Sequence, residues 1–181
     1  MLTIQLSMSI TQEATLLGSS EEKDKLGWGV SPYTSGGNIM ANIYLASPFF
    51  NEEELKHVEK AEQVLRALGH TVFSPRENQL PEVEFGSFEW RTFVFKNDLE
   101  HIKWADMVFG IIGENYDDTG TAWELGAAYI LGKPVLLFNP KGEIINLMIT
   151  DSLHAYFEDM NEVARYDFAT LPIKPYLKPV K

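Results

Sequence analysis

The sequence predicts an α/β fold, in which a doubly wound, five-stranded parallel sheet in the order 2-1-3-4-5 has helices on both faces. Three observations predict it. Short apolar runs recur between residues 42 and 157, segments of helical periodicity separate them, and glycine or proline ends several of these segments. Strands that alternate with helices of about three to five turns favour βαβ units with right-handed crossovers, and therefore a mostly parallel sheet.

The first βαβ unit begins with the run NIYLAS at 42–47, an apolar stretch suited to a buried strand. Asn51 is expected to cap a helix that runs through Leu68, because apolar side chains recur on one face of this segment and Gly69 follows it. The run HTVFSP at 70–75 is the second expected strand.

The rest of the chain repeats the alternation, beginning with a helix expected from about Phe88 to Trp104. The further expected elements are a strand at 106–112, a helix within 117–134, a strand at 134–138, a loop at 139–148, a short strand at 151–157 and a last helix at 158–166. This order is that of a flavodoxin-like fold, in which ligands lie outside the carboxyl ends of the strands. Site residues should therefore follow strands.

Residues 1–39 differ from the rest of the chain. Their first part, LTIQLSMSIT, alternates apolar and polar residues as a strand does, and two polar, loop-like stretches follow. We expect an N-terminal extension at 1–39, an edge strand or an arm used in self-association, and a single domain at 40–181.

Composition excludes several classes of function. Acidic residues outnumber basic ones 26 to 15, the formal net charge is −11, and no Lys/Arg cluster occurs, so no nucleic-acid partner is expected. The chain has no cysteine, which excludes disulfides, a thiol nucleophile and thiolate metal sites. No apolar run approaches the ~18 residues of a membrane span and no signal-peptide pattern is present, so we expect a cytoplasmic protein without a membrane partner.

Familiar cofactor and metal motifs are also missing. Neither GxxxxGK[ST] nor GxGxxG occurs, and neither do GxSxG or HExxH. The histidines show no spacing typical of metal ligands. We therefore expect no cofactor and no metal, and the remaining candidates for chemistry are carboxylates and amides at strand ends.

Glu124 lies near the start of the helix that follows the third strand, and two interpretations of it are open. It completes a capping-box pattern with Thr121 as N-cap, or it is catalytic. Asp98 falls on the expected inward stripe of its own helix, where an acid is usually paired or functional. A structural pair with Arg91 or a loop amide is the alternative for Asp98. The stripe consists of Val94, Phe95, Leu99 and Ile102.

Carboxylates that converge on an uncharged pocket without metal ligands suggest cleavage of a glycosidic bond. The helix start would keep Glu124 ionised, as a nucleophile requires. Apolar surroundings would raise the pKa of Asp98, as an acid catalyst requires.

The chain resembles the nucleoside 2-deoxyribosyltransferases in an ordered set of segments. These are IYLASPFF (43–50), SPRENQ (74–79), WRTFVFKNDLEHI (90–102), DDTGTAWELGAAYILGKPVLL (117–137), INLM (145–148) and YDF (166–168). The resemblance implies transfer of 2-deoxyribose between purine or pyrimidine bases. The transfer would retain the configuration at the sugar carbon, follow a ping-pong mechanism and serve nucleotide salvage. Its partners would be deoxynucleosides and free nucleobases.

The resemblance also implies roles for particular residues. Glu124 would be the nucleophile, Tyr44 would orient it, and Asp98 would exchange a proton with the base. From the residues alone, ordinary packing is the alternative for Tyr44, Phe50 and Asn146. The implied substrate-binding residues are Asp118 at a sugar hydroxyl, Gln79 and Phe50 at the base, and Asn146 from a neighbouring subunit of a homo-oligomer, in which dimers pack into hexamers.

Two other functions stay open. A 2′-deoxynucleoside 5′-monophosphate N-glycosidase resembles the same family, but it would need phosphate contacts after the first strand. There the chain has ASPFFNEEE (46–54), whose acidic end would repel a phosphate. A non-catalytic nucleoside-binding module is the third possibility. The chain ends in KPYLKPVK, where Tyr176 is the candidate for the aromatic residue that closes the site in the family.

Overall fold

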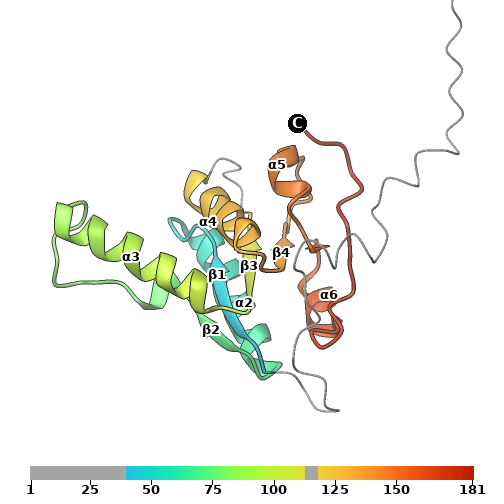
Figure 1. The fold of residues 1–181 in the computed structure, drawn as a ribbon, viewed down its shortest axis with the longest axis horizontal. Coiled ribbons are helices and arrows are strands. Elements are labelled where there is room, and N and C mark those ends of the chain that lie inside the picture. Colours follow the sequence, from blue (N-terminus) through green and yellow to red (C-terminus); the bar gives the residue numbers. More distant parts are fainter. Residues whose placement is uncertain (1–39, 113–117) are drawn as a thin grey trace, which may run out of the picture. The chain divides into compact units, whose positions relative to one another are not determined.

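The computed structural model describes residues 40–112 and 118–181; the expected arm at 1–39 and Asp117 lie outside the described residues. In the described part, five parallel strands form one sheet in the order β2-β1-β3-β4-β5, which confirms the predicted order (Figure 1). The strands are β1 (Asn42–Ala46), β2 (Thr71–Phe73), β3 (Met107–Ile111), β4 (Val135–Phe138) and β5 (Ala155–Phe157).

Helices connect these strands as predicted. The long connections are α2 (Glu52–Ala67), α3 (Phe88–Trp104) and α4 (Thr119–Ile130), and the shorter helices are η2, a 3₁₀ turn (Pro75–Glu77), α5 (Leu147–Thr150) and α6 (Met160–Arg165). None of the helices in 40–112 and 118–181 is long and apolar enough to span a membrane.

The expected signals at both ends of α2 are confirmed. The side chain of Asn51 accepts hydrogen bonds from the main-chain N–H groups of Glu53 and Glu54. These are donors that a helix start leaves without an internal partner. At the other end Gly69 has a φ of 92°, a left-handed conformation that favours glycine.

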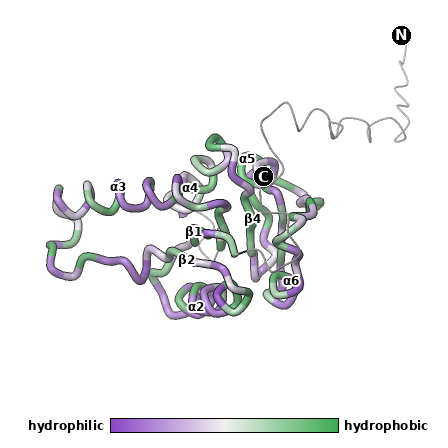
Figure 2. Tube along the Cα trace, turned by 60° about the horizontal axis from the view of Figure 1, so that its bottom comes forward, coloured by the Kyte–Doolittle hydropathy of each residue, from purple (hydrophilic) through white to green (hydrophobic). Residues whose placement is uncertain are grey.

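Strand β1 serves both faces of the sheet. Ile43 and Leu45 belong to the core that α2 and α6 cover, whereas Tyr44 and Ala46 belong to the core that includes residues of α3 and α4. This alternation follows from the two-residue period of a strand. The other strands alternate in the same way, and helices cover both faces of the sheet. Both sets of side chains are therefore apolar, and the sequence of each strand is a continuous apolar run, as Figure 2 shows along β4.

Gly110 allows α4 to approach β3 closely. A Cβ atom at this position would lie 2.7 Å from Cδ2 of Leu125 and 3.0 Å from Cδ1 of Leu137, closer than side-chain atoms pack. The absence of a side chain at Gly110 therefore leaves room for the side chain of Leu125, the residue after Glu124 on α4, to pack against β3.

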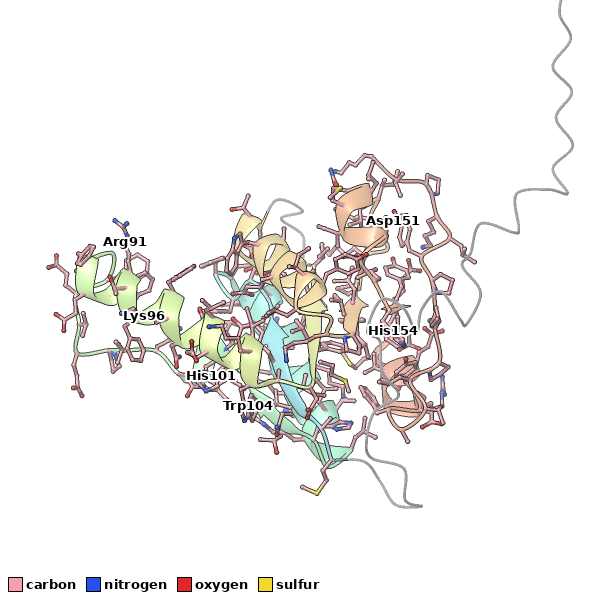
Figure 3. The ribbon with its side chains drawn as sticks, in the orientation of Figure 1. Arg91, Lys96, His101, Trp104, Asp151 and His154 are labelled. Carbon is pink, nitrogen blue, oxygen red and sulfur yellow. The ribbon has the colours of Figure 1, made fainter. Side chains whose placement is uncertain are left out.

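Three details differ from the expectations. Helix α5, which was not expected, begins in the last two residues of the expected loop at 139–148, and β5 is shorter than the expected strand at 151–157. The expected inward stripe of α3 is wrong in its outer part: Ile102 is buried, but Phe95 is 54% exposed. The reason is that only the end of α3 lies against the sheet. Arg91 and Lys96 are on the half that extends away, while His101 and Trp104 lie beside the sheet (Figure 3).

Candidate active site

A tyrosine from β1 and a glutamate from α4 meet at the carboxyl end of the sheet. The hydroxyl of Tyr44 donates a hydrogen bond to Oε1 of Glu124 at 2.9 Å. Tyr44 is fully buried, and its ring stacks on Phe73 with centroids 5.8 Å apart. Burial, followed by the charges of Glu124 and Asp98, raises the pKa of Tyr44 far above its ordinary value. Tyr44 therefore remains a hydrogen-bond donor at any pH at which the protein works.

Asp118, rather than Thr121, caps α4. Oδ2 of Asp118 accepts from the main-chain N–H of Thr121 at 3.0 Å and also from the Thr121 hydroxyl. The capping box proposed for Thr121 and Glu124 is therefore wrong, because the helix begins at Thr119, one turn earlier than that reading assumed. Glu124 lies in the second turn and satisfies no donor at the helix start.

The electrostatic expectation for Glu124 is also wrong. Burial raises the pKa of Glu124 to about 8, the hydrogen bond from Tyr44 opposes the rise, and the charges of Asp98 and Asp118 add to it. The favourable field of a helix start fades beyond its first turn. The cost of burying the charge thus outweighs it at this position.

Asp98 has the raised pKa that the sequence predicted. Burial raises the pKa of this carboxyl to about 6, while nearby His101 acts to lower it. The alternative pair with Arg91 receives no support, since none of the ion pairs between described residues joins them and Arg91 lies on the outer half of α3 (Figure 3). The raised pKa of Asp98 does not require the whole expected apolar stripe of α3 to be buried, because the inner end of the helix buries this carboxyl.

Four predicted residues therefore share one region of the sheet edge. Tyr44 touches Glu124, and the carboxylates of Asp98 and Asp118 are close enough to change its pKa. Carboxyls coupled in this way titrate as a group. Such an arrangement can hold one carboxylate as a nucleophile and another as an acid. Within 40–112 and 118–181, no cluster of three or more His, Asp or Glu side chains could hold a metal ion.

The residues expected to contact the nucleobase lie nearer the surface of the protein. Phe50 is 77% exposed and stacks on Phe49, with ring centroids 5.6 Å apart. The side chain of Gln79 donates to the main-chain oxygen of Pro75 at 2.7 Å and lines a cavity of about 530 Å³ on the outer loop. The hydrogen bonds of the described residues link neither Phe50 nor Gln79 to Glu124.

Asn146 caps α5. Its Oδ1 accepts from the main-chain N–H of Met148 at 2.9 Å, and the residue is exposed. Asn146 and Asp118 line the same cavity of about 630 Å³ between α4 and α5, but Glu124 is not among the lining residues. Asn146 therefore faces α4 across this cavity, and it does not reach the proposed nucleophile of its own chain through it.

Sequence reasoning missed two side chains that support the site. Glu54 is buried, and its Oε2 accepts the main-chain N–H of Phe50 at 2.7 Å. Its position three residues after the cap Asn51 was the available signal. His101, for which the sequence predicted no role, stacks on Phe73 with ring centroids 3.5 Å apart. Nothing in the sequence around His101 predicts that contact, because Phe73 belongs to β2, which is distant from α3 in the sequence.

Known proteins with similar sequences belong to one family. The family model described as nucleoside 2-deoxyribosyltransferase matches residues 43–159. A nucleoside deoxyribosyltransferase of Limosilactobacillus fermentum is 28% identical over 151 residues, covering 74% of this chain and 90% of that protein. One of Lactobacillus johnsonii is 32% identical over 109 residues, covering 53% and 70%.

Comparison with solved structures gives a similar result. A 2-deoxyribosyltransferase from Bacillus psychrosaccharolyticus is 89% identical, with a TM-score of 0.73, and the match covers 76% of this chain and all of that one. A CMP N-glycosidase from Clostridium botulinum, 20% identical with a TM-score of 0.50, covers 68% of this chain and 96% of its own and shares the fold alone.

Proposed function

Since the chain belongs to the nucleoside 2-deoxyribosyltransferase family and is an enzyme of that class, we propose that it transfers 2-deoxyribose between purine or pyrimidine bases through a covalent deoxyribosyl–Glu124 intermediate. The observation that carries the proposal is the hydrogen bond from the buried Tyr44 hydroxyl to Glu124 at the carboxyl end of the sheet. It fixes one carboxylate oxygen and leaves the other for attack on a sugar carbon.

The first half of the reaction forms the glycosyl-enzyme. A carboxylate oxygen of Glu124 bonds to C1′ of the deoxynucleoside while the bond from C1′ to the base nitrogen breaks, and Asp98 gives its proton to the departing base. In the second half, a nitrogen of another base bonds to C1′, the ester bond to Glu124 breaks, and the proton lost by that base returns to Asp98. Two inversions at C1′ give overall retention.

The pKa values of the two carboxyls favour the opposite distribution of protons. The reaction needs an ionised Glu124 and a protonated Asp98, yet their pKa values are about 8 and about 6. At neutral pH the reactive arrangement is then a minor fraction of the molecules. The hydrogen bond from Tyr44 increases that fraction, because it lowers the pKa of Glu124.

Binding roles for the other residues extend the proposal. We propose that Asp118 binds a sugar hydroxyl and that Gln79 and Phe50 contact the base. We also propose a homo-oligomer in which dimers pack into hexamers and Asn146 reaches the site of a neighbouring subunit. What supports this is the exposed apolar surface around Asn146, made by Ile130, Leu147 and Met148.

The test is a base-exchange assay with one deoxynucleoside, with and without a second free base. Exchange supports the transferase, release of the base alone would indicate a hydrolase, and neither would indicate a binding module. The intermediate is tested by incubating the protein with the deoxynucleoside alone and digesting it at low pH. A peptide containing Glu124 should gain the mass of one deoxyribosyl group, and the Glu124→Gln variant should not. Exchange without that adduct, together with retained exchange in the variant, would refute the covalent route.

A further inference from the structure

The last segment of the chain, Lys174–Lys181, runs from β5 toward α5, and we refer to it as the tail. It starts beside the sheet, where Lys174 forms a parallel bridge with Ala155. The main-chain N–H of Tyr156 donates to the oxygen of Lys174 at 2.8 Å, and the N–H of Lys174 donates to the oxygen of His154 at 3.1 Å. The tail is thus anchored at its first residue as an added strand would be.

Two side chains hold the middle of the tail. The ring of Tyr176 packs edge-on against Tyr156, with centroids 4.8 Å apart, and its hydroxyl donates to the main-chain oxygen of Pro179 at 2.9 Å. Lys178 pairs with Glu158. Tyr176 is therefore engaged with Tyr156 and the tail itself, which leaves its expected role of closing the site without support.

The end of the tail binds the main chain on both sides of Asn146. The N–H of Lys181 donates to the oxygen of Ile145 at 3.2 Å, and the N–H of Leu147 donates to the oxygen of Lys181 at 3.3 Å. Leu147 is the first residue of α5, so the second bond satisfies a donor that a helix start leaves unpaired.

Helix α5 depends on such contacts for its position. It spans only Leu147–Thr150, and a helix of that length does not form by itself in water. Its place beside α4 must come from its own cap and from the segments that bind it. Among the described residues, the tail is the one segment distant in sequence whose main chain bonds the residues flanking Asn146.

We propose that the tail is a positioning element that sets the direction of the Asn146 side chain, and so tunes binding of the deoxyribosyl group. The inference rests on the proposed role of Asn146 in substrate binding. Two hydrogen bonds fix the peptide groups before and after this residue. Without them, Asn146 would keep its chemistry but sample several orientations over the cavity that it shares with Asp118.

Deletion of Pro179–Lys181 tests the inference in the full-length background. It removes both bonds around Asn146, but it leaves the Lys174 bridge, the ring contact of Tyr176 and the Lys178–Glu158 pair. We expect kcat/KM for base exchange to fall about tenfold, the scale for losing two hydrogen bonds that position a group. A more specific test compares two substitutions of Lys181. Lys181→Pro lacks the main-chain N–H that donates to Ile145, whereas Lys181→Ala keeps it. Exchange should be about threefold slower in the proline variant.

A double-mutant cycle separates positioning from general damage. If the tail acts through Asn146, its deletion should change kcat/KM little in an Asn146→Ala background. An equal loss in both backgrounds, or no loss in either, would overturn the inference. If Asn146→Ala alone leaves exchange unchanged, the proposed role of Asn146 fails, and a deletion that still slows exchange shows that the tail acts elsewhere.

Discussion

Replacing Glu124 by glutamine should stabilise the fold, and increasingly so as the pH rises. The amide keeps nearly the shape of the carboxyl, and its oxygen still accepts the hydrogen bond from Tyr44. The variant lacks only the ionisable group. Because burial raises the pKa of Glu124 from 4.5 to about 8, the folded wild type resists a charge that the unfolded chain accepts freely.

The size of the effect follows from that shift. A rise of the pKa from 4.5 to about 8 corresponds to roughly 5 kcal/mol of unfolding free energy once the pH is well above 8. For a group whose pKa is raised on folding, stability is complete below the unfolded value and is lost as the pH rises through the folded value. The advantage of the glutamine variant should therefore be about 1 kcal/mol at pH 5, about 3 kcal/mol at pH 7 and nearly 5 kcal/mol at pH 9.

Urea unfolding of the two proteins at these three pH values, at one protein concentration, measures this difference. Glu89→Gln, on the exposed first turn of α3, is the matched control, since an exposed side chain has no burial cost to relieve. If the unfolding free energies of the wild type and Glu124→Gln stay parallel from pH 5 to pH 9, burial does not disfavour the charge of Glu124 and the reasoning fails.

Four further predictions concern activity and assembly. Tyr44→Phe removes the hydrogen bond that lowers the pKa of Glu124, which is the higher pKa of the pair, so the falling limb of kcat/KM against pH should move to higher pH and the plateau below it should drop; an unmoved limb with an unchanged plateau would contradict this. Asp98→Asn should slow single-turnover exchange roughly 10²–10⁴-fold, and less for a base that leaves without protonation; equal losses on both substrates would show that Asp98 transfers no proton. Gly110→Ala should lower the unfolding free energy by about 1–3 kcal/mol in urea titrations and should also slow exchange, because the Leu125 side chain, next to Glu124 on α4, must shift to make room for the added methyl group. Subunit exchange between the inactive Glu124→Ala protein and the slowed Asn146→Ala protein should give more activity than either protein alone, whereas a fully active monomer on a sizing column would exclude shared sites.

The sequence predicted most of the fold because its signals are local. The apolar run at 42–47 marks β1, and Asn51 and Gly69 mark the ends of α2. Helix α5 was missed since four residues are too few for a period to appear. The cap of α4 was misplaced because Asp118 and Thr121 are both residues that cap helices, and only the backbone decides where the helix begins.

The candidate site was less predictable than the fold. The approach of Tyr44 to Glu124 was predicted only through the family resemblance, because eighty positions of sequence separate them. The pKa of Glu124 was misjudged since it depends on burial by segments that are remote in the chain. For α3, the periodicity predicted a helix correctly but did not reveal which half lies against the sheet.

The alternation along β1 restricts how this protein can change in length. Ile43 and Leu45 face one layer of helices and Tyr44 faces the other, so one inserted or deleted residue would turn every following side chain to the opposite face. The hydroxyl that binds Glu124 would then lie on the α2 side, and Ile43 (after an insertion) or Leu45 (after a deletion) would take its place. A homologous enzyme can exchange the side chains of this strand one at a time during evolution, but insertions and deletions must fall in the loops on either side of it.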